Sequence, residues 1–159
     1  MTHSIRPAVR ADVPTILRFV RELAAFEREP DAVEATEAML DRALFEEKAA
    51  EALIAERDGE AVGFALFFHN FSTWKGRKGL YLEDLYVTPE ARGSGVGRAL
   101  LEHLAALAVE RDCARFEWAV LDWNQPAIDF YTAMGAEMMG EWRIERVTGK
   151  ALARLAERG

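Results

Sequence analysis

The chain has 159 residues, of which 50% are hydrophobic and 30% charged, so it can bury one globular core but has little room for two domains. It contains no apolar run of the roughly 20 residues that a membrane span needs and no signal peptide, so we expect a cytoplasmic protein that binds no membrane. A net charge of -7 argues against nucleic acid as a partner and suits a small cationic substrate. Cys113 is the single cysteine and the three histidines are scattered, so neither a disulfide nor a metal site is expected.

Apolar spacing predicts a strand, two helices and a β-hairpin in the first half of the chain, over residues 4–8, 12–24, 36–44 and 52–68. Asp12 and Thr36 are residue types that cap helices, and each stands where an apolar helical pattern begins. The Asp58-Gly59 pair favours a tight turn between the two strands of the hairpin.

The second half is predicted to hold alternating strands and helices, over residues 80–87, 95–110, 115–120, 124–135, 137–147 and a last helix around Leu152 and Leu155. Asn124 and Pro126 are typical of a helix start, and Gly135 of a helix end. The order of elements predicts a mixed α/β sheet with helices on both faces. We see no repeat or linker, so residues 1–159 are expected to form a single domain.

The segment from Leu80 to Arg98 combines a strand, a glycine-rich loop and a helix start. Two adjacent carboxylates, Glu83 and Asp84, lie in the strand, and the loop follows as Arg-Gly-Ser-Gly-Val-Gly-Arg. A helix start exposes backbone N–H groups and the positive end of the helix dipole, and glycines let a phosphate approach the backbone closely. The segment therefore predicts an anion cradle beside a candidate base.

Two common nucleotide-binding motifs do not fit this loop. The dinucleotide fingerprint would need a third glycine where Arg98 stands, and the P-loop would need a Gly-Lys-Ser/Thr run that is missing. The remaining pattern, Arg-x-x-Gly-x-Gly from Arg92 to Gly97, resembles the pyrophosphate-binding signature of the GNAT acetyltransferase superfamily. A glycine-rich turn with only a structural role is the alternative.

The resemblance extends over most of the chain, from the first strand to Trp142. The runs at 71–77, 81–87 and 119–131 are similar to the diamine acetyltransferase group, which includes spermidine/spermine acetyltransferases and relatives that act on thialysine. Residues 72–76 and 121–125 look more like the thialysine branch, and the segment 138–141 is shorter than in the animal polyamine enzymes. The resemblance implies a GNAT fold, a mixed and mostly antiparallel sheet flanked by helices on both faces, with a splayed and bulged central strand.

The implied activity is transfer of acetyl from acetyl-CoA to the primary amine of a small cation, either a di- or polyamine or a lysine-like amino acid. An amine with a pKa of about 10.4 must lose its proton first, which costs about 4 kcal/mol at neutral pH. The resemblance assigns the base to Glu83, acting through water, and the acid that protonates the thiolate to Tyr131. Asp84 either holds the cationic amine or is structural, and strand alternation places it on the face opposite Glu83 unless a bulge intervenes.

The resemblance also implies binding residues for acetyl-CoA and for the amine. The cofactor contacts are the strand backbone of Leu85, Tyr86 and Val87, the loop residues Arg92, Gly93, Ser94, Gly95, Val96, Gly97 and Arg98, and the side chains of Asn124 and Tyr131. As alternatives, Asn124 is a plain helix cap and Tyr131 packs in a core. Trp74, Trp123 and Trp142 are candidates for the wall of an amine channel, since aromatic faces attract ammonium groups, and ordinary packing is their alternative.

Two other functions fit the same residues, namely acetylation of a protein lysine or N-terminus and a non-catalytic acyl-CoA-binding module. The first needs an open groove, whereas the tryptophan-rich loops suggest a closed channel. Retention of Glu83 and Tyr131 argues against the second. The resemblance further implies a homodimer in which the last strands are exchanged, with Trp142 to Ile144 at the edge.

Overall fold

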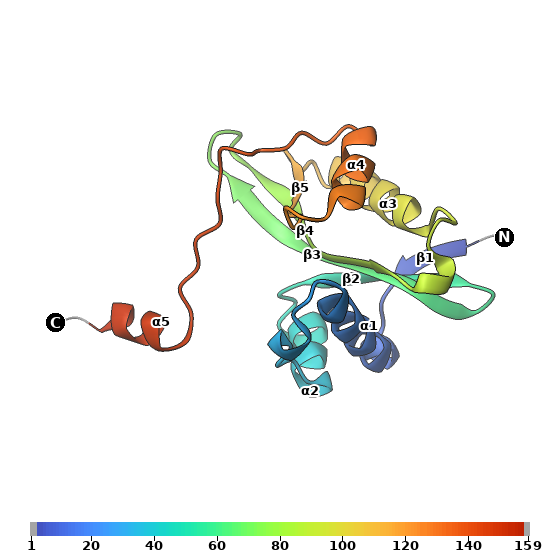
Figure 1. The fold of residues 1–159 in the computed structure, drawn as a ribbon, viewed down its shortest axis with the longest axis horizontal. Helices are drawn as coiled ribbons and strands as arrows, with labels where there is room; N and C mark the ends of the chain where they lie inside the picture. Colours follow the sequence, from blue (N-terminus) through green and yellow to red (C-terminus); the bar gives the residue numbers. More distant parts are fainter. Residues whose placement is uncertain (1–2, 158–159) are drawn as a thin grey trace. The chain divides into compact units, whose positions relative to one another are not determined.

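A computed structural model describes residues 3–157, which fall into two compact units. The first unit extends to Leu121 and the second begins at Asp122. The second unit holds α4 (Gln125–Ala133) and α5 (Gly149–Ala156) (Figure 1). The first unit holds β1 (His3–Pro7), η1 (Arg10–Asp12), α1 (Val13–Phe26), η2 (Pro30–Ala32), α2 (Glu37–Asp41), η3 (Arg42–Glu46), β2 (Glu51–Arg57), β3 (Glu60–Ser72), β4 (Arg77–Val87), η4 (Pro89–Ala91), α3 (Val96–Glu110) and β5 (Phe116–Trp118).

The five strands form one sheet in the order β1-β2-β3-β4-β5. The first four strands are antiparallel to their neighbours, and β5 lies parallel to β4. The predicted hairpin turn is confirmed, because Asp58 and Gly59 both have positive φ, 52° and 79°, as a two-residue turn of this hand requires. The sheet is therefore mixed and mostly antiparallel, as expected from the sequence.

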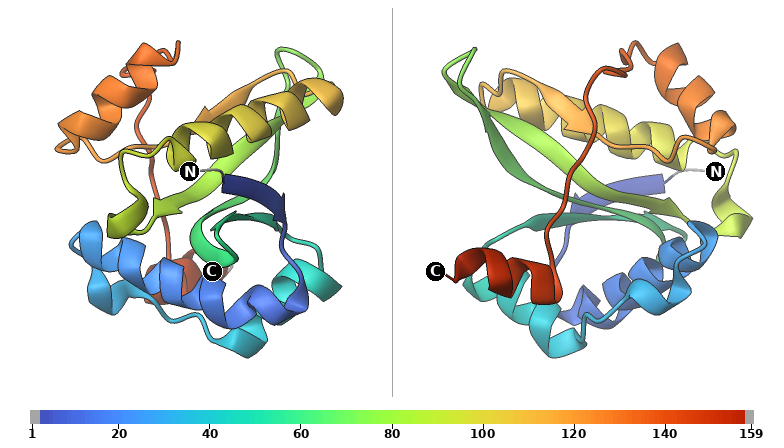
Figure 2. Two further views of the ribbon diagram at one scale, coloured as in Figure 1. Left: turned by 90° about the vertical axis from the view of Figure 1, so that its right-hand side faces the viewer. Right: turned by 60° about the vertical axis from the view of Figure 1, so that its left-hand side comes forward.

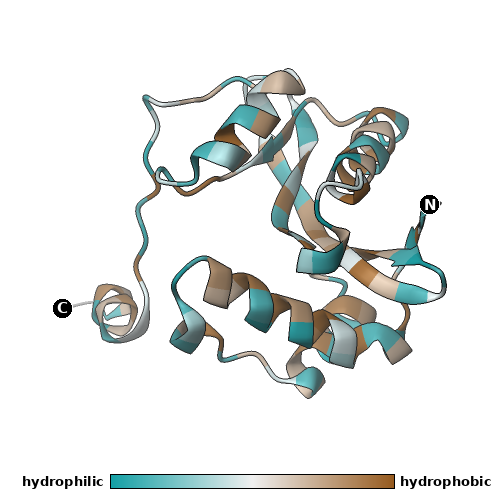
Figure 3. Cartoon of the chain, turned by 45° about the vertical axis from the view of Figure 1, so that its right-hand side comes forward, coloured by the Kyte–Doolittle hydropathy of each residue, from teal (hydrophilic) through white to brown (hydrophobic). Residues whose placement is uncertain are grey.

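The helices α1 and α3 cover opposite faces of this sheet (Figure 2). Phe64 of β3 points to α1, and its ring centre lies 5.8 Å from that of Phe19. The preceding residue, Gly63, faces α3, since a Cβ there would lie 3.3 Å from Val96 and 2.8 Å from the carbonyl oxygen of Tyr86. Both helices are amphipathic, with apolar residues on one side and polar residues on the other (Figure 3), so each buries one face. The close approach at Gly63 fixes the start of α3 against the strands.

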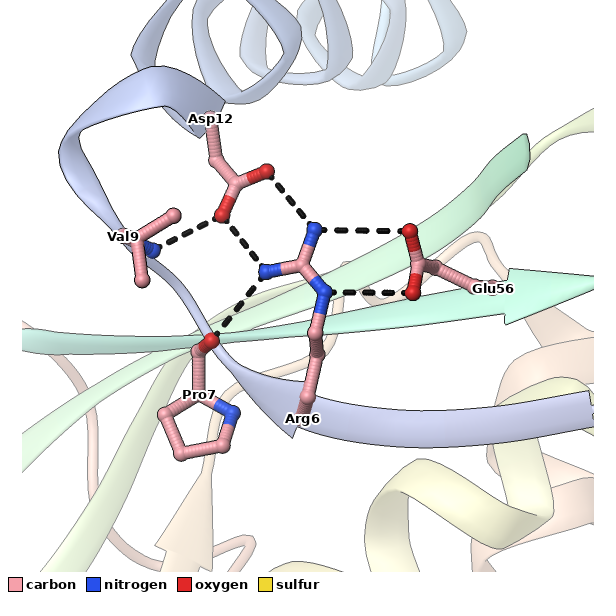
Figure 4. A network of polar contacts seen from close by, with 5 residues as sticks. All are labelled: Arg6, Pro7, Val9, Asp12 and Glu56. Atoms are coloured by element: carbon pink, nitrogen blue, oxygen red, sulfur yellow. Dashed lines mark hydrogen bonds and ion pairs between the residues drawn. The ribbon is translucent and has the colours of Figure 1, made fainter. Parts of the chain in front are cut away.

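Arg6 joins β1, β2 and the start of α1 through a network of ion pairs (Figure 4). Its guanidinium donates to both carboxylate oxygens of Asp12, at 2.7 and 2.9 Å, and to Glu56 at 3.1 Å. Asp12 stands at the expected N-cap position of α1, but its carboxylate accepts the Val9 N–H instead of an N–H of the helix. Asp12 therefore anchors the helix to the sheet through Arg6.

One predicted strand is wrong. Residues 137–147 form no strand, and the exposed fractions of Trp142 and Ile144 are 66% and 73%. A strand is stable only when a neighbour pairs with its backbone, and the sheet described for residues 3–157 pairs none with this segment. The strand predicted over 115–120 exists but is shorter, from Phe116 to Trp118.

None of the helices described for residues 3–157 is both long and apolar enough to cross a membrane.

We expect Asp12→Asn to lower the free energy of unfolding by about 1–2 kcal/mol at pH 7, because it removes a charged partner from Arg6. The Arg6 guanidinium is the main cause that holds the pKa of Asp12 below its ordinary value of 3.8. The wild type therefore gains this stability above that pH and loses it as the pH falls through the lowered pKa, so the difference between the two proteins shrinks in acid. Urea unfolding between pH 3 and pH 7 measures it.

Glu47→Gln is the matched control, because the Arg42–Glu47 pair at 3.0 Å is exposed. Exposed pairs contribute about 0–1 kcal/mol, so this variant should unfold close to the wild type. Equal effects of the two substitutions would contradict the anchoring role of Asp12.

Candidate functional site

A β-bulge interrupts β4 at Glu83. Leu66 of β3 pairs with Asp84, whereas the next residue, Phe67, pairs with Leu82, so Glu83 has no partner across β3. A bulge inserts one extra residue into one strand and bends it locally. The bulged central strand that the resemblance implies is confirmed, and the extra residue is the candidate base.

The bulge places Asp84 on the same face of the sheet as α1. Asp84 lies opposite Leu66, which packs against the core around Phe19. Tyr81 lies opposite Phe68, which shares a face with Leu66 because strand side chains alternate. In a regular strand Asp84 would instead point to the α3 face, where Leu82 is buried. The register shift thus turns a carboxylate from one side of the sheet to the other.

Three carboxylates meet on this face. Burial is the main cause that raises the pKa of Asp84 to about 6, followed by the charges of Glu83 and Glu27. Glu27 is the residue directly after α1, and burial together with the charge of Glu83 raises its pKa as well. We call Glu27, Glu83 and Asp84 the acidic cluster. Such a cluster attracts a cation, and a carboxyl with a pKa near 6 can exchange a proton close to neutral pH.

Glu27 was not predicted from the sequence. It is one of 27 acidic residues and ends an ordinary amphipathic helix, so no local pattern distinguishes it. Only the packing of α1 against the bulged strand brings it to Glu83 and Asp84.

The strand β4 keeps one backbone edge unpaired beyond the bulge. Its parallel pairing with β5 covers Leu80 to Leu82 and ends there, while the pairing with β3 continues to Val87. In the sheet described for residues 3–157, Leu85, Tyr86 and Val87 therefore pair on one side only. An extended ligand can add to such an edge as another strand would. This is the splay between central strands that the resemblance implies.

The loop that follows β4 leads to an uncapped helix start. Gly93 and Gly95 adopt positive φ, 80° and 91°, and a Cβ on either would meet no protein atom within 4 Å. Gly95 is the N-cap of α3 and provides no side-chain acceptor for the first N–H groups. These donors and the helix dipole suit a pyrophosphate, so the backbone from Gly93 to Arg98 fits the predicted role. The exposed Arg98 contributes charge and lies 3.4 Å from Glu102.

The Arg92 side chain has contacts within the protein. Its Nε donates to the carbonyl oxygen of Val87 at 3.0 Å. Its guanidinium carbon lies 5.5 Å from the ring centre of Phe26 and 5.6 Å from that of Tyr86. The Tyr86 hydroxyl donates to Glu22 at 2.7 Å, and burial followed by this hydrogen bond raises its pKa to about 12. Arg92 therefore connects β4 with the end of α1.

The remaining predicted residues lie elsewhere in the fold. Trp74 is in the turn between β3 and β4, 80% exposed, with the Arg115 guanidinium 5.9 Å from its ring centre.

The second unit holds four predicted residues, namely Trp123, Asn124, Tyr131 and Trp142. There Asn124 caps α4, since its side-chain oxygen accepts the Ala127 N–H at 3.4 Å, and the predicted cap is confirmed. Tyr131 is half-buried on α4, with its ring centre 5.6 Å from that of Phe130.

Known proteins resemble this chain along nearly its whole length. The sequence pattern of the Acetyltransferase (GNAT) family matches residues 16–136. A thialysine N-epsilon-acetyltransferase of Bos taurus is 40% identical over 96% of either chain. The L-ornithine N5-acetyltransferase NATA1 of Arabidopsis thaliana is 31% identical over 96% of this chain and 87% of its own length. An integron cassette protein from the mobile metagenome of V. cholerae superimposes with a TM-score of 0.82, at 28% identity, over 99% of either chain.

We expect Asp84→Asn to raise the free energy of unfolding by about 1–2 kcal/mol at pH 8. The folded protein holds the Asp84 proton up to a pH of about 6, above its ordinary value of 3.8. The wild type therefore loses stability as the pH rises between these two values, and the neutral amide does not. Urea unfolding at pH 5 and pH 8 should give a larger gain at pH 8.

Glu102→Gln, at an exposed site on α3, controls for the loss of one negative charge. A gain from Asp84→Asn that is independent of pH would mean that Asp84 is ionised throughout and would contradict its raised pKa.

Proposed function

The chain belongs to the GNAT acetyltransferase family, and on that premise we propose that it transfers the acetyl group of acetyl-CoA to a primary amine of a small cationic molecule. The observation that carries this proposal is the acidic cluster beside an open strand edge, followed directly by an uncapped helix start. The acidic cluster can bind a cation, and the open edge with the helix start can bind an extended anionic cofactor, so both sites adjoin on one strand. We further propose that residues 1–159 act as one acetyltransferase domain, since the family match spans both units.

Acetyl-CoA supplies the activated acetyl thioester when it is bound. The protein residues that would hold it are the backbone of Leu85 to Val87, along the open edge of β4, and the N–H groups from Gly93 to Arg98. Gly63 helps to position this site, because its missing side chain lets the start of α3 lie within contact distance of β3 and β4. Asn124 fits an indirect role, since its cap fixes the start of the helix that carries Tyr131.

The acidic cluster provides both attraction and a base for the amine. Glu83 is exposed at the bulge, where a water can lie between its carboxylate and an ammonium group, and we assign it the role of general base. The half-buried Asp84 and Glu27 then bind the cation, and a bound ammonium favours their ionised forms. This charge lowers the free energy of bringing a diamine or lysine-like cation to the strand. Trp74, Trp123 and Trp142 are proposed as aromatic contacts of the amine.

Tyr131 is proposed as the acid that returns a proton to the departing thiolate. A phenol with a pKa of about 10 donates to a thiolate whose conjugate acid has a pKa of about 8.5 at modest cost.

The relatives extend the proposal to substrate class. Those from cattle and pig are named thialysine N-epsilon-acetyltransferases and are 40% and 38% identical, so we place a lysine-like side-chain amine first and a diamine second.

Thiol release from acetyl-CoA, measured over thialysine, ornithine, lysine, spermidine, 1,3-diaminopropane and a lysine-containing peptide, tests the function. We expect turnover with the small cations and little with the peptide. Tyr131→Phe should lower kcat by about 10²- to 10⁴-fold, because it removes only the proton donor. Its Kd for acetyl-CoA, measured by calorimetry, should stay within about twofold of the wild type.

Thr132→Ala, at the next and exposed position of α4, serves as the control and should retain activity. Binding of acetyl-CoA without turnover on any amine would contradict the enzyme and favour an acyl-CoA-binding module. Preference for the peptide would favour a protein acetyltransferase.

We also propose a cytoplasmic homodimer in which the 137–147 segment pairs with a second copy. The sequence predicts a strand over this segment, yet the sheet described for residues 3–157 pairs no strand with it, and Trp142 and Ile144 are exposed. Light scattering after gel filtration should give twice the mass of the 17.9 kDa chain, and Ile144→Asp should give a monomer. Leu155→Ser, at an exposed site on α5, is the control. A monomeric wild type would contradict the dimer.

A further inference from the structure

We infer that Arg92, held between Phe26 and Tyr86, is a positioning residue that couples the pyrophosphate loop to the acidic cluster. It sets the place of Glu27 relative to Glu83 and Asp84, and so the affinity for the amine. The inference rests on the proposed function for the identity of the ligands. Its geometric basis is independent of that function.

The first step is the position of the Arg92 side chain. Its backbone begins the glycine-rich loop, and its guanidinium reaches back over the ring of Phe26 on α1 and the ring of Tyr86 on β4. The hydrogen bond to the Val87 carbonyl oxygen fixes the Nε end of the same group. Tyr86 is held in turn by its hydrogen bond to Glu22, which lies one helical turn before Phe26. Arg92 therefore joins loop, strand and helix at one point.

The second step is the rigid connection between Phe26 and Glu27. The Glu27 N–H donates to the Leu23 carbonyl oxygen at 2.9 Å, so the last turn of α1 continues through it. The chain then turns sharply at Arg28, whose φ is 66°, and the Glu29 N–H donates to the Ala24 carbonyl oxygen at 2.9 Å. These bonds close the helix end as in a left-handed C-terminal cap. A shift of Phe26 must therefore shift Glu27.

The third step is the consequence for binding. A pyrophosphate that orders the loop also orders Arg92, and through Phe26 it restrains the helix end that carries Glu27. The charges that act on Asp84 are those of Glu83 in its own strand and of Glu27 at the end of α1, so the negative charge offered to an ammonium depends on this helix end. Binding of the cofactor and binding of the amine should then favour each other, because linkage between two sites is reciprocal.

Phe26→Leu tests the coupling without touching the loop. A cation–π contact at a partly exposed site contributes about 0.5–1 kcal/mol, so we expect KM for the amine to rise about two- to fivefold. KM for acetyl-CoA extrapolated to zero amine should stay within about 1.5-fold, because Phe26 lies outside the loop, whereas at saturating amine it should rise by the same factor as KM for the amine. Arg92→Lys keeps the charge but loses the planar stacking and should raise KM for the amine in the same way.

Phe45→Leu is the matched control, because the Arg10 guanidinium carbon lies 5.7 Å from the Phe45 ring centre in a contact of the same kind away from the acidic cluster. It should lower stability without changing either KM.

A second readout does not depend on turnover. In carbon-13 NMR of the carboxyl groups, Phe26→Leu should lower the pKa of Asp84 toward its ordinary value, since Glu27 would withdraw, and Phe45→Leu should not. An unchanged titration, or a rise of KM for acetyl-CoA alone, would overturn the coupling. Absence of turnover in the wild type would instead contradict the proposed function, while the titration would still decide this inference.

Discussion

The bulge at Glu83 is the constraint on which the candidate site depends. One extra residue in β4 lets Asp84 face α1, although a regular strand would have buried its carboxylate against α3. Asp84 then lies near the charges of Glu83 and Glu27, and these three carboxylates share one face beside the open edge of β4. A single change of register thus converts an apolar strand into one that carries a cation site.

The same strand is left incomplete where the cofactor is proposed to bind. In the sheet described for residues 3–157, β5 pairs with β4 over three residues, and the β4 backbone beyond Leu82 pairs on the β3 side alone. Open backbone edges invite unwanted pairing, and buried carboxylates with raised pKa values reduce stability. Both features are unfavourable for folding and useful for binding, so they mark the part of the sheet where function rather than stability determined the residues.

The surrounding structure restrains these features. Arg6 holds the start of α1 to β1 and β2, Arg92 holds its end to β4, and Gly63 brings α3 against the strands. Both ends of α1 are therefore fixed to the sheet by arginines, one through carboxylates and one through aromatic rings. A helix held in this way can keep Glu27 near two other acidic residues despite their mutual repulsion.

The sequence by itself determined the helices, the hairpin turn at Asp58-Gly59 and the loop between β4 and α3, because periodicity, turn chemistry and glycine spacing act over a few residues. The resemblance to family motifs also allowed Glu83 and Asp84 to be selected. Only the tertiary structure decided that a bulge turns Asp84 toward α1, that Glu27 joins it and that the Arg92 guanidinium contacts protein groups. It also decided that no strand within residues 3–157 pairs with residues 137–147. These outcomes depend on partners distant in sequence, and local patterns carry no information about which distant groups pack together.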